Sequence, residues 1–320
     1  MENFKTEKMS NTFGTLFRLT DFGESHGPAL GGIIDGCPAG VEIDMDFIRR
    51  ELAQRAPSED ANSTQRREPD EVRFLSGIYQ GKTLGTPIGF IIENHDVKIE
   101  SENSMVLKPS HASFTYKEKY GLTDNFGAGR ASARQTVCRV VAGAVAKLFL
   151  RQYGITIEAF LAEPLPEYPE NDTVGAKIGC KISHLPAGLG EPVYDKLDAR
   201  LAYAMLSINA AKGIEIGEGF KATQMLGSSY NDKQEQDFHF RSNHDGGIQA
   251  GISNGEEVCF QVAFKPIPTL RQAQDTIDFQ GNAVSYSGSD RNDRCVYPRV
   301  LPVVEAMAAL VIADMMRLRG

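Results

Sequence analysis

The chain has 320 residues, of which 41% are hydrophobic and 24% are charged, and its formal net charge is −8. This composition is typical of a globular protein with a large buried core. An acidic chain without a block of lysines and arginines is a poor binder of nucleic acid, and no apolar run is long enough to span a membrane, so neither partner is expected.

The first predicted elements are two strands and a helix. Alternating patterns predict strands at residues 12–21 and 31–34, joined by a glycine-rich turn. Asp44 can cap the helix that follows, because its side chain can accept a hydrogen bond from the free N–H groups of the first turn. The apolar face of that helix is formed by Phe47, Ile48 and Leu52.

A hairpin and a long polar stretch come next. Residues 72–79 and 87–93 are predicted to pair around the glycines of residues 81–85. Residues 94–126 are polar over a length that usually carries function or disorder.

The remaining elements mix helices and strands. Residues 131–153 give the clearest helix, and its apolar residues at helical spacing predict that it is buried. Strands are expected at residues 155–162, 174–184 and 258–265, and further helices at residues 197–208 and 300–317.

This uneven mixture predicts an α+β fold. No Pro/Ser-rich linker divides the chain, so we expect a single domain over residues 10–320 after a polar, disordered extension at residues 1–9, with Met1 and Met9 as alternative starts. The glycine pattern of residues 31–36 recurs at residues 246–251, which makes an internal pseudo-duplication a hypothesis. No Gly-x-Gly-x-x-Gly turn opens a strand–helix unit, so a Rossmann fold is not expected.

The cysteines and histidines argue against disulfides and metals. The five cysteines are scattered without a Cys-x-x-Cys spacing, which is typical of reduced thiols in the cytoplasm. None of the six histidines pairs with another at a metal-ligand spacing on a helix, so no metal is expected.

The most informative segment is the turn around His26. Its sequence, Phe-Gly-Glu-Ser-His-Gly-Pro over residues 22–28, places a histidine between glycines, beside a carboxylate and a hydroxyl. Glycine lets the backbone approach a ligand closely, and histidine exchanges protons near neutral pH. We interpret the segment as a proton-transfer group on a tight turn.

Residues 127–134, Gly-Ala-Gly-Arg-Ala-Ser-Ala-Arg, form a second unusual segment directly before the long helix. The free N–H groups and the dipole of a helix N-terminus favour phosphate, and Arg130, Arg134 and Arg139 add positive charge. The alternative is a glycine turn with solvated arginines. We favour an anion site, because arginines beside an otherwise apolar helix suggest inward-facing anionic partners.

Other charged groups allow two interpretations each. The run at residues 65–68, with Arg55 upstream, is more simply explained as solvated charge than as a site. His111 is a candidate acid only if a phosphate or oxyanion lies beside it. Asp293 follows Arg291 by two residues, and it is either part of a structural ion pair or a proton acceptor held ionised by its neighbour.

Together these segments resemble the chorismate synthase family over nearly the whole chain. The matching motifs, in chain order, are Asn11–Gly14, Phe22–Gly27, Thr64–Pro69, Leu75–Gly77, Pro109–His111, Lys119–Gly121, Arg130–Arg134, Pro186–Pro192, Met205–Ala210, Asn243–His244, Gly251–Ser253, Phe264–Pro266 and Val303–Met307. So many ordered matches make the resemblance specific.

The resemblance implies a helical layer between two antiparallel sheets, assembled as a homotetramer. It implies a cytoplasmic carbon–oxygen lyase acting on phosphates, in the shikimate pathway of aromatic amino-acid biosynthesis. The implied reaction is the trans-1,4-elimination of phosphate and a ring hydrogen from 5-enolpyruvylshikimate 3-phosphate, which gives chorismate. The implied cofactor is reduced FMN, with NADPH as the source of its electrons. Transient electron donation from the flavin can help the phosphate leave without a net redox change.

The same resemblance assigns roles to individual residues. His26 matches the histidine that protonates the reduced flavin, His111 the one that assists the departing phosphate, and Asp293 the aspartate that works with the flavin to remove the ring proton. Positions that match substrate binding are Arg55, Lys108, Arg134 and Arg291. Positions that match cofactor binding are Arg55, Arg130, Ala131, Ser132, Asn209, Ala210, Ala250, Lys265, Pro266, Ile267, Pro268, Thr269 and Arg291. We expect the two imidazoles, the carboxylate, Arg134 and Arg291 to share one pocket.

Several positions depart from the family pattern. Residues 55–61 read Arg-Ala-Pro-Ser-Glu-Asp-Ala, where the family usually has Arg-Arg-Pro-Gly and a further basic residue. Lys108 stands for an arginine, and Ser110 and Ala250 stand for glycines. Each lost charge-assisted bond costs roughly 1.5–3 kcal/mol. The alternative function is therefore a divergent paralogue that binds flavin or a phosphorylated metabolite without efficient elimination.

Overall fold

The computed structural model describes residues 11–57, 68–97, 106–120, 129–288 and 292–319. The extension expected at residues 1–9 lies outside this part of the chain, as does Arg291.

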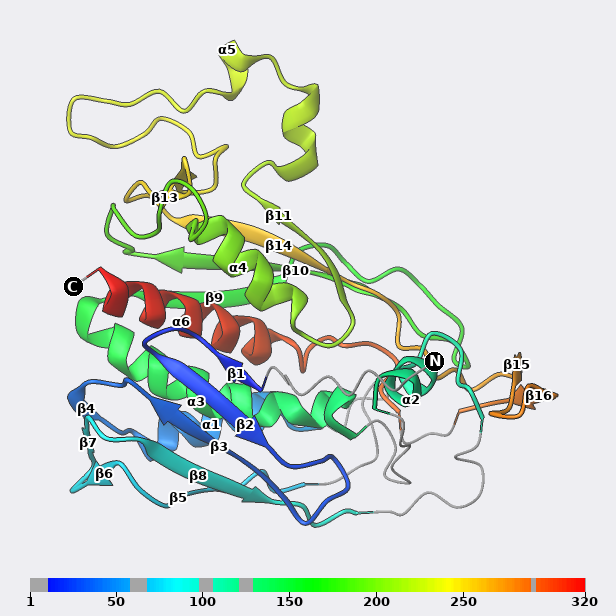
Figure 1. The fold of residues 1–320 in the computed structure, drawn as a ribbon. Coiled ribbons are helices and arrows are strands. Elements are labelled where there is room, and N and C mark those ends of the chain that lie inside the picture. Colours follow the sequence, from blue (N-terminus) through cyan, green and yellow to red (C-terminus); the bar gives the residue numbers. More distant parts are fainter. Residues whose placement is uncertain (1–10, 58–67, 98–105, 121–128, 289–291, 320) are drawn as a thin grey trace, which may run out of the picture.

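Two antiparallel sheets enclose two layers of helices (Figure 1). The first sheet has the strand order β1-β2-β3-β8-β5, and the second has the order β11-β14-β10-β9. Helices α1 and α3 pack against each other on the side of the first sheet, and α4 and α6 on the side of the second. This arrangement confirms the predicted α+β class with helices between two sheets.

The strands of the first sheet are β1 (Thr12–Phe13), β2 (Arg18–Phe22), β3 (Ala29–Asp35), β5 (Val72–Phe74) and β8 (Ile88–Glu93). The strands of the second sheet are β9 (Thr156–Leu161), β10 (Ala176–Ser183), β11 (Ala211–Ile216) and β14 (Val258–Phe264). The four helices between them are α1 (Met45–Arg55), α3 (Thr136–Leu150), α4 (Leu197–Leu206) and α6 (Leu301–Leu318).

The shorter elements lie around these layers. Three small antiparallel sheets have the orders β4-β7-β6, β12-β13 and β15-β16. Their strands are β4 (Ala39–Glu42), β6 (Ile78–Tyr79), β7 (Lys82–Leu84), β12 (Ile248–Gln249), β13 (Ile252–Ser253), β15 (Gln274–Ile277) and β16 (Ala283–Tyr286). The two remaining α-helices of the described chain are α2 (Ser113–Tyr120) and α5 (Gly227–Tyr230).

The core is centred on the contact between α3 and α6. A methyl group on Gly143 would lie only 2.3 Å from Cβ of Ala306, so the two helices approach as closely as backbones allow at that point. Lys147 of α3 bridges Glu51 of α1 and Glu305 of α6, with Nζ–Oε2 distances of 2.6 and 2.5 Å. This cation, whose side chain is 11% exposed, pairs with a carboxylate on each side and so connects the two helical layers.

The prediction for α1 is confirmed. Asp44 Oδ1 accepts a hydrogen bond from the N–H of Phe47 at 2.9 Å, and Ile48 and Leu52 are buried. The helix ends at Arg55, whose position matters for the site.

The prediction of one strand over residues 12–21 is wrong in its middle. Strands β1 and β2 pair with each other in antiparallel fashion, so the chain turns between them. Asp314 of α6 fixes the turn, because its carboxylate accepts hydrogen bonds from the N–H groups of residues 15–17 at 2.6–2.9 Å. Gly14, with φ +92°, supplies the left-handed backbone that this turn needs.

The predicted hairpin is confirmed in its outer pairing only. Val72 of β5 lies opposite Ile92 of β8, but the chain between them folds into the separate pair β6 and β7. The long helix expected from residue 131 begins later, at Thr136, because two 3₁₀ turns at residues 129–131 and 133–135 precede it. The later predicted elements are confirmed as β9, β10, β14, α4 and α6.

The two glycine-rich repeats take different conformations. Residues 31–35 belong to β3, whereas residues 246 and 247 form a turn before β12. All five cysteines are free thiols, and only Cys259 is not fully buried. Among the described residues, no helix combines the length and the apolar character that crossing a bilayer requires.

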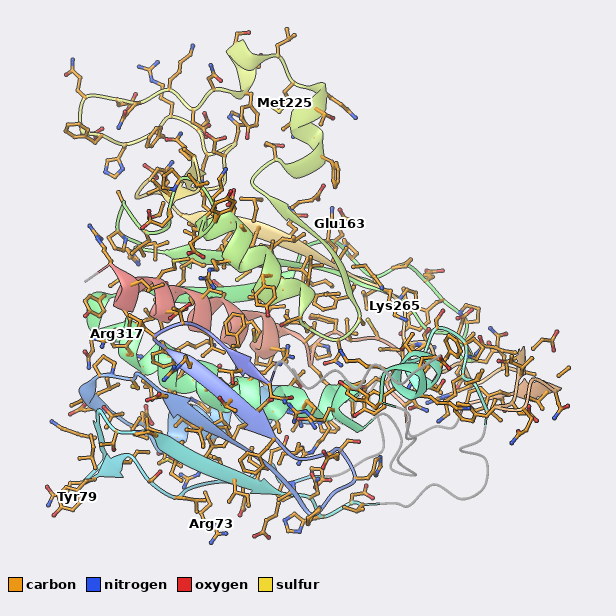
Figure 2. All side chains as sticks on the ribbon, viewed as in Figure 1. Arg73, Tyr79, Glu163, Met225, Lys265 and Arg317 are labelled. Atoms are coloured by element: carbon orange, nitrogen blue, oxygen red, sulfur yellow. The ribbon has the colours of Figure 1, made fainter. Side chains whose placement is uncertain are left out.

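Residues 217–247 form a projecting segment beyond the second sheet, at the top of Figure 1. Figure 2 shows Met225 far out on it, whereas the space between the two sheets is filled with side chains. The segment exposes large apolar side chains, since Phe220, Leu226 and Phe238 are 78%, 75% and 78% exposed.

Candidate active site

The turn that carries His26 joins β2 to β3, and side chains from other parts of the chain hold it in place. Asn94, just after β8, donates its Nδ2 to the carbonyl oxygens of Gly27 at 2.8 Å and Glu24 at 3.2 Å. The Asn94 N–H also donates to the carbonyl of Pro28 at 3.0 Å. His26 is half-buried on a turn whose backbone is held in place, as proton transfer to a defined partner requires.

Arg130 fastens the other end of the same turn. Its guanidinium forms an ion pair with Asp21 and donates to the carbonyl of Gly23 at 3.2 Å and to Oε1 of Gln135 at 3.3 Å. Gln135 donates to the same Gly23 carbonyl at 2.7 Å. The predicted cofactor residue Arg130 therefore uses both terminal nitrogens on its own chain.

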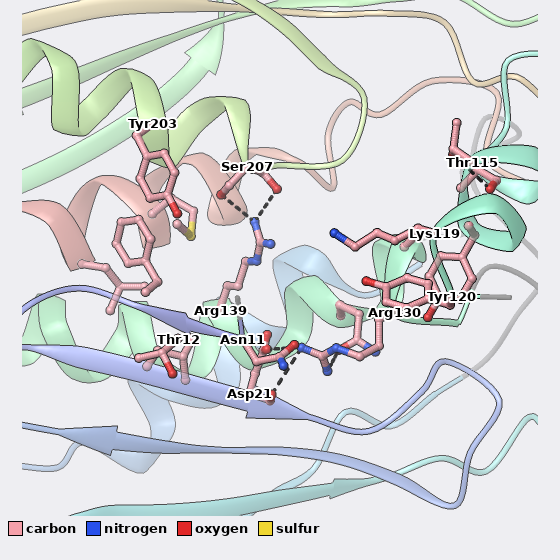
Figure 3. A pocket seen from close by; sticks show the side chains of 18 residues that line it. Asn11, Thr12, Asp21, Thr115, Lys119, Tyr120, Arg130, Arg139, Tyr203 and Ser207 are labelled. Carbon is pink, nitrogen blue, oxygen red and sulfur yellow. Dashed lines mark hydrogen bonds and ion pairs between the residues drawn. The ribbon is translucent and has the colours of Figure 1, made fainter. Parts of the chain in front are cut away.

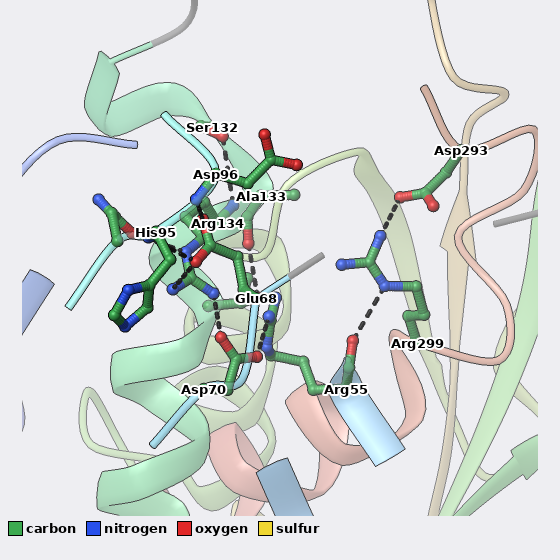
Figure 4. A network of polar contacts seen from close by, with 12 residues as sticks. Arg55, Glu68, Asp70, His95, Asp96, Ser132, Ala133, Arg134, Asp293 and Arg299 are labelled. Atoms are coloured by element: carbon green, nitrogen blue, oxygen red, sulfur yellow. Dashed lines mark hydrogen bonds and ion pairs between the residues drawn. The ribbon is translucent and has the colours of Figure 1, made fainter. Parts of the chain in front are cut away.

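Arg134 and Arg55 share one buried carboxylate, that of Asp70 (Figure 4). The Asp70 side chain is 1% exposed, and the two arginines are 3% and 4% exposed. Arg134 also donates its Nε to Oδ1 of Asn94 at 3.0 Å, which connects this group to the His26 turn. The two predicted substrate residues are thus parts of one network rather than separate surface charges.

The charges of this network shift its pKa values. Burial alone would raise the pKa of Asp70, but the positive charges of Arg55 and Arg134 outweigh it and hold that pKa below its usual value. Burial lowers the pKa of Arg55 to about 10 against the pull of Asp70. Both groups are therefore ionised at neutral pH.

Asp293 joins the same network through Arg299. Arg299 Nη1 lies 2.5 Å from Oδ2 of Asp293, and Arg299 Nε donates to the backbone carbonyl of Arg55 at 2.9 Å. Of the two interpretations left open for Asp293, an ion pair is present, and Arg299 is a partner of Asp293 among the described residues. The predicted neighbour Arg291 lies outside the described residues.

His111 lies on a turn just before α2, and Lys265, the residue after β14, holds that turn. Lys265 Nζ donates to the carbonyl of Ser110 at 2.9 Å, and its backbone N–H donates to the carbonyl of Ala210 at 2.9 Å. Burial lowers the pKa of Lys265, and the nearby Lys212 acts in the same direction. Lys108 places its ammonium group 5.6 Å from the ring centroid of Tyr286.

Most of the predicted cofactor residues are connected to one another and to Lys265. Asn209 Nδ2 donates to the carbonyl of Ala131 at 2.7 Å, so residues 209–210, Lys265 and the 130–134 segment are connected. Residues 266–269 continue from Lys265, and the carbonyl of Ile267 accepts from Thr173 Oγ1 at 2.7 Å. Ser132 Oγ accepts a hydrogen bond from the N–H of Arg134 at 3.2 Å. This bond connects the predicted cofactor residues with the network around Asp70.

Ala250 is not brought to this place. Its neighbour Gly251 accepts a hydrogen bond from Leu197, the first residue of α4, whereas Asn209 follows the last turn of α4. A ten-residue helix is about 15 Å long. Within the chain, Ala250 and Asn209 therefore lie at opposite ends of that helix.

A pocket of about 430 Å³ opens beside Arg130 (Figure 3). Arg139 projects into it and donates its Nη1 to the carbonyl and the hydroxyl of Ser207, at 2.9 and 3.1 Å. Lys119 and Tyr203 also line it. Of the predicted site residues, the pocket is lined by Arg130 and Ala131.

Two donors of the central network suit an incoming anion. Arg55 Nε and Arg134 Nη2 are buried and have no hydrogen-bond partner among the described residues. Arg134 Nη2 lies 3.9 Å from a carboxylate oxygen of Glu68, which is too far for a hydrogen bond. Buried donors without acceptors are costly, and guanidinium groups bind phosphate and carboxylate well.

The acidic partners of the arginines were not predicted. Glu68 was expected to belong to a solvated run, but its side chain is only 2% exposed, and residues 65–67 lie outside the described chain. Asp70 and Arg299 were not singled out at all. In the sequence, only their positions relative to the family motifs could have pointed to them. Asp70 follows the motif that ends at Pro69, and Arg299 lies between the motifs at residues 264–266 and 303–307.

The comparisons with known proteins decide the family. The chorismate synthase family model matches residues 17–165 and 167–317. The chorismate synthase of Christiangramia forsetii is 48% identical, over 95% of this chain and 96% of its own length. That of Parabacteroides distasonis is 45% identical, over 95% and 97%. The chain belongs to the chorismate synthase family.

A solved structure agrees with this membership. A crystal structure of chorismate synthase matches with a TM-score of 0.74 and 27% identity, over 96% of this chain and 93% of that one. The two segments that match the chorismate synthase model contain the main residues of the candidate site. His26 and Arg134 lie in the first segment, and Asp293 lies in the second. As a member of this family the protein is a lyase with a small-molecule substrate.

Proposed function

We propose that this protein removes phosphate and a ring hydrogen from 5-enolpyruvylshikimate 3-phosphate to form chorismate, with reduced FMN as cofactor. The observation that carries the proposal, beyond family membership, is the pair of buried guanidinium donors at Arg55 and Arg134. The substrate carries a phosphate and carboxylates, which such donors bind in water-poor surroundings.

The proposed roles follow from the positions of the side chains. Arg55, Arg134 and Lys108 bind the negative groups of the substrate. His111 donates a proton or a hydrogen bond to the departing phosphate, and Asp293 accepts the ring proton on its carboxylate. His26, on its fastened turn, exchanges a proton with the cofactor.

The cofactor is proposed to lie beside the connected group of residues that includes Asn209 and Lys265. Ala131, Ser132, Asn209, Ala210 and residues 265–269 would hold it, and the ammonium group of Lys265 fits an anionic group there. When bound, reduced flavin supplies transient electron donation that assists the loss of phosphate. The residues of this chain bind and orient both molecules and handle the protons.

The divergent-paralogue alternative is not favoured. Relatives named chorismate synthase are 45–48% identical over nearly the full chain. Arg55, the first residue of the altered 55–61 segment, is retained and buried.

The test is anaerobic chorismate formation with the purified chain, chemically reduced FMN and the phosphorylated substrate, followed by product absorbance and released phosphate. His111→Ala is expected to slow a single turnover by about 10²–10⁴-fold, with nearly unchanged flavin affinity. His239→Ala, at an exposed histidine of the projecting segment, is the matched control. No product with enzyme in excess over substrate would reject the proposal, and the same assay with NADPH in place of the chemical reductant measures flavin reduction.

The homotetramer and the cytoplasmic location stay predictions. The exposed Phe220, Leu226 and Phe238 of the projecting segment favour assembly, because apolar side chains of this size are normally covered. Light scattering of the purified protein would measure the mass, and a monomer at micromolar concentration would contradict the assembly.

A further inference from the structure

Arg299 connects two parts of the molecule that are far apart in sequence. Its Nη1 lies 2.5 Å from Oδ2 of Asp293, and its Nε donates to the carbonyl oxygen of Arg55 at 2.9 Å (Figure 4). Arg299 stands two residues before α6, and Arg55 is the last residue of α1. One guanidinium group therefore holds the candidate base against the end of a core helix.

The carbonyl of Arg55 is a firm anchor. The last carbonyl groups of a helix have no partner within the helix and carry the negative end of its dipole, so they attract cations. Helix α1 is itself fixed by the Asp44 cap and by the buried Ile48 and Leu52. The guanidinium of Arg55 is fixed in addition by Asp70.

The planar shape of the guanidinium group fixes the direction of its contact with Asp293. Its nitrogens lie in one plane, so binding the Arg55 carbonyl through Nε fixes where Nη1 points. Arg299 and Asp293 are 17% and 20% exposed, so their pairing is partly shielded from water. A lysine at this position would carry the same charge on a flexible stem without the planar fork.

We propose that Arg299 is a positioning residue that aims the carboxylate of Asp293 at the ring hydrogen of the substrate. This inference rests on the proposed function, in which the ring C–H bond breaks and the proton goes to Asp293. The electron pair of that bond becomes part of the new double bond, and the phosphate leaves with the electrons of its C–O bond. Arg299 touches neither substrate nor cofactor in this scheme and acts through Asp293.

The test uses single turnovers of the full chain with chemically reduced FMN, and with substrate that carries protium or deuterium at the departing ring position. Arg299→Gln is expected to slow turnover 10- to 100-fold and to raise the deuterium isotope effect, because removal of the ring proton becomes more limiting. Flavin and substrate affinities should change less than threefold. Arg299→Lys should recover part of the rate, and added guanidinium ion should recover part of the rate of Arg299→Gln.

The matched control is Arg200→Lys. Arg200 of α4 forms a partly exposed pair with Asp195, which precedes that helix, at 2.6 Å and away from the network. The rate and isotope effect of Arg200→Lys should stay at the wild-type values. If the wild type forms no chorismate, the proposed function is overturned, and the role of Asp293 with it. If the wild type is active and both Arg299 variants keep its rate and isotope effect, only the positioning role is overturned. Should Arg299→Gln fail to fold, Arg299→Lys carries the same comparison.

Discussion

Replacing Asp70 by asparagine removes the charge that Arg55 and Arg134 share while keeping the size of the side chain. In the native protein the three side chains are between 1% and 4% exposed, so water cannot replace the lost carboxylate. Two cationic groups would then lie next to each other without a common counter-ion. We therefore expect Asp70→Asn to destabilise the fold strongly.

The size of the effect follows from the contacts. Asp70 takes part in two charge-assisted hydrogen bonds, each with a net value of roughly 1.5–3 kcal/mol. Asparagine can still accept one weaker hydrogen bond. Removing one partner of a buried ion pair typically costs about 3–5 kcal/mol, and we expect a loss in the lower half of that range.

The pH dependence has a defined sign. The pKa of Asp70 is lowered in the folded protein, and in the unfolded chain it is about 3.9. The stabilisation by ionised Asp70 is therefore complete well above pH 4, and it is lost as the pH falls through the lowered folded pKa. The difference between wild type and Asp70→Asn should stay constant from pH 7 to about pH 5 and shrink in more acidic solution.

Urea unfolding at several pH values measures both effects. With an m value of about 3 kcal/mol per M, the midpoint of Asp70→Asn should fall by about 1 M at pH 7. Asp46→Asn, which breaks an exposed pair with Arg49 on α1, is the control and should cost less than about 1 kcal/mol. If Asp70→Asn changed the midpoint no more than Asp46→Asn does, the reasoning about the buried network would be refuted.

Three further predictions concern other parts of the fold. Ala250 has φ +52°, a left-handed backbone conformation that glycine adopts more easily, so Ala250→Gly should raise the free energy of unfolding by about 1 kcal/mol. Ala199→Gly, at an exposed position of a helix, should lower it by a similar amount. Urea midpoints measure both changes. Burial raises the pKa of Cys37 and of Cys138 to about 12, so a thiol reagent at pH 8 should label the native chain far more slowly than the urea-unfolded chain, and equal rates would contradict this. Asn94→Ala should speed hydrogen exchange of the N–H of residue 27 and its neighbours about tenfold or more, while unchanged exchange would show that other contacts hold the turn.

The sequence predicted those elements whose cause is local. The cap at Asp44 and the apolar periodicity of residues 136–150 depend on neighbours within a few residues, and both are confirmed. The turn after Gly14 could not be predicted, because it depends on the carboxylate of Asp314, about 300 residues away in sequence. The same holds for Lys147, whose two partners come from two other helices.

The candidate site divides in the same way. The arginines and the histidines could be singled out, because their residue types suggest anions and protons wherever they stand. The resemblance to chorismate synthases then gave them roles. Their partners could not be predicted, since a carboxylate such as Asp70 or Glu68 looks solvated until the fold buries it.

The partners change how the altered 55–61 segment is understood. The guanidinium of Arg55 is held by Asp70, and its backbone belongs to α1, which Ile48 and Leu52 fix in the core. The position of Arg55 is therefore set by the core and not by the residues that follow it. The chain leaves α1 directly afterwards, at Ala56, whose N–H still donates to Leu52 at 3.0 Å. The departures from the family pattern therefore begin just beyond the last point that the network fixes. Charge lost there would weaken the attraction for the substrate, whereas Arg55, Arg134 and Asp293 would keep their contacts with residues 70, 94 and 299.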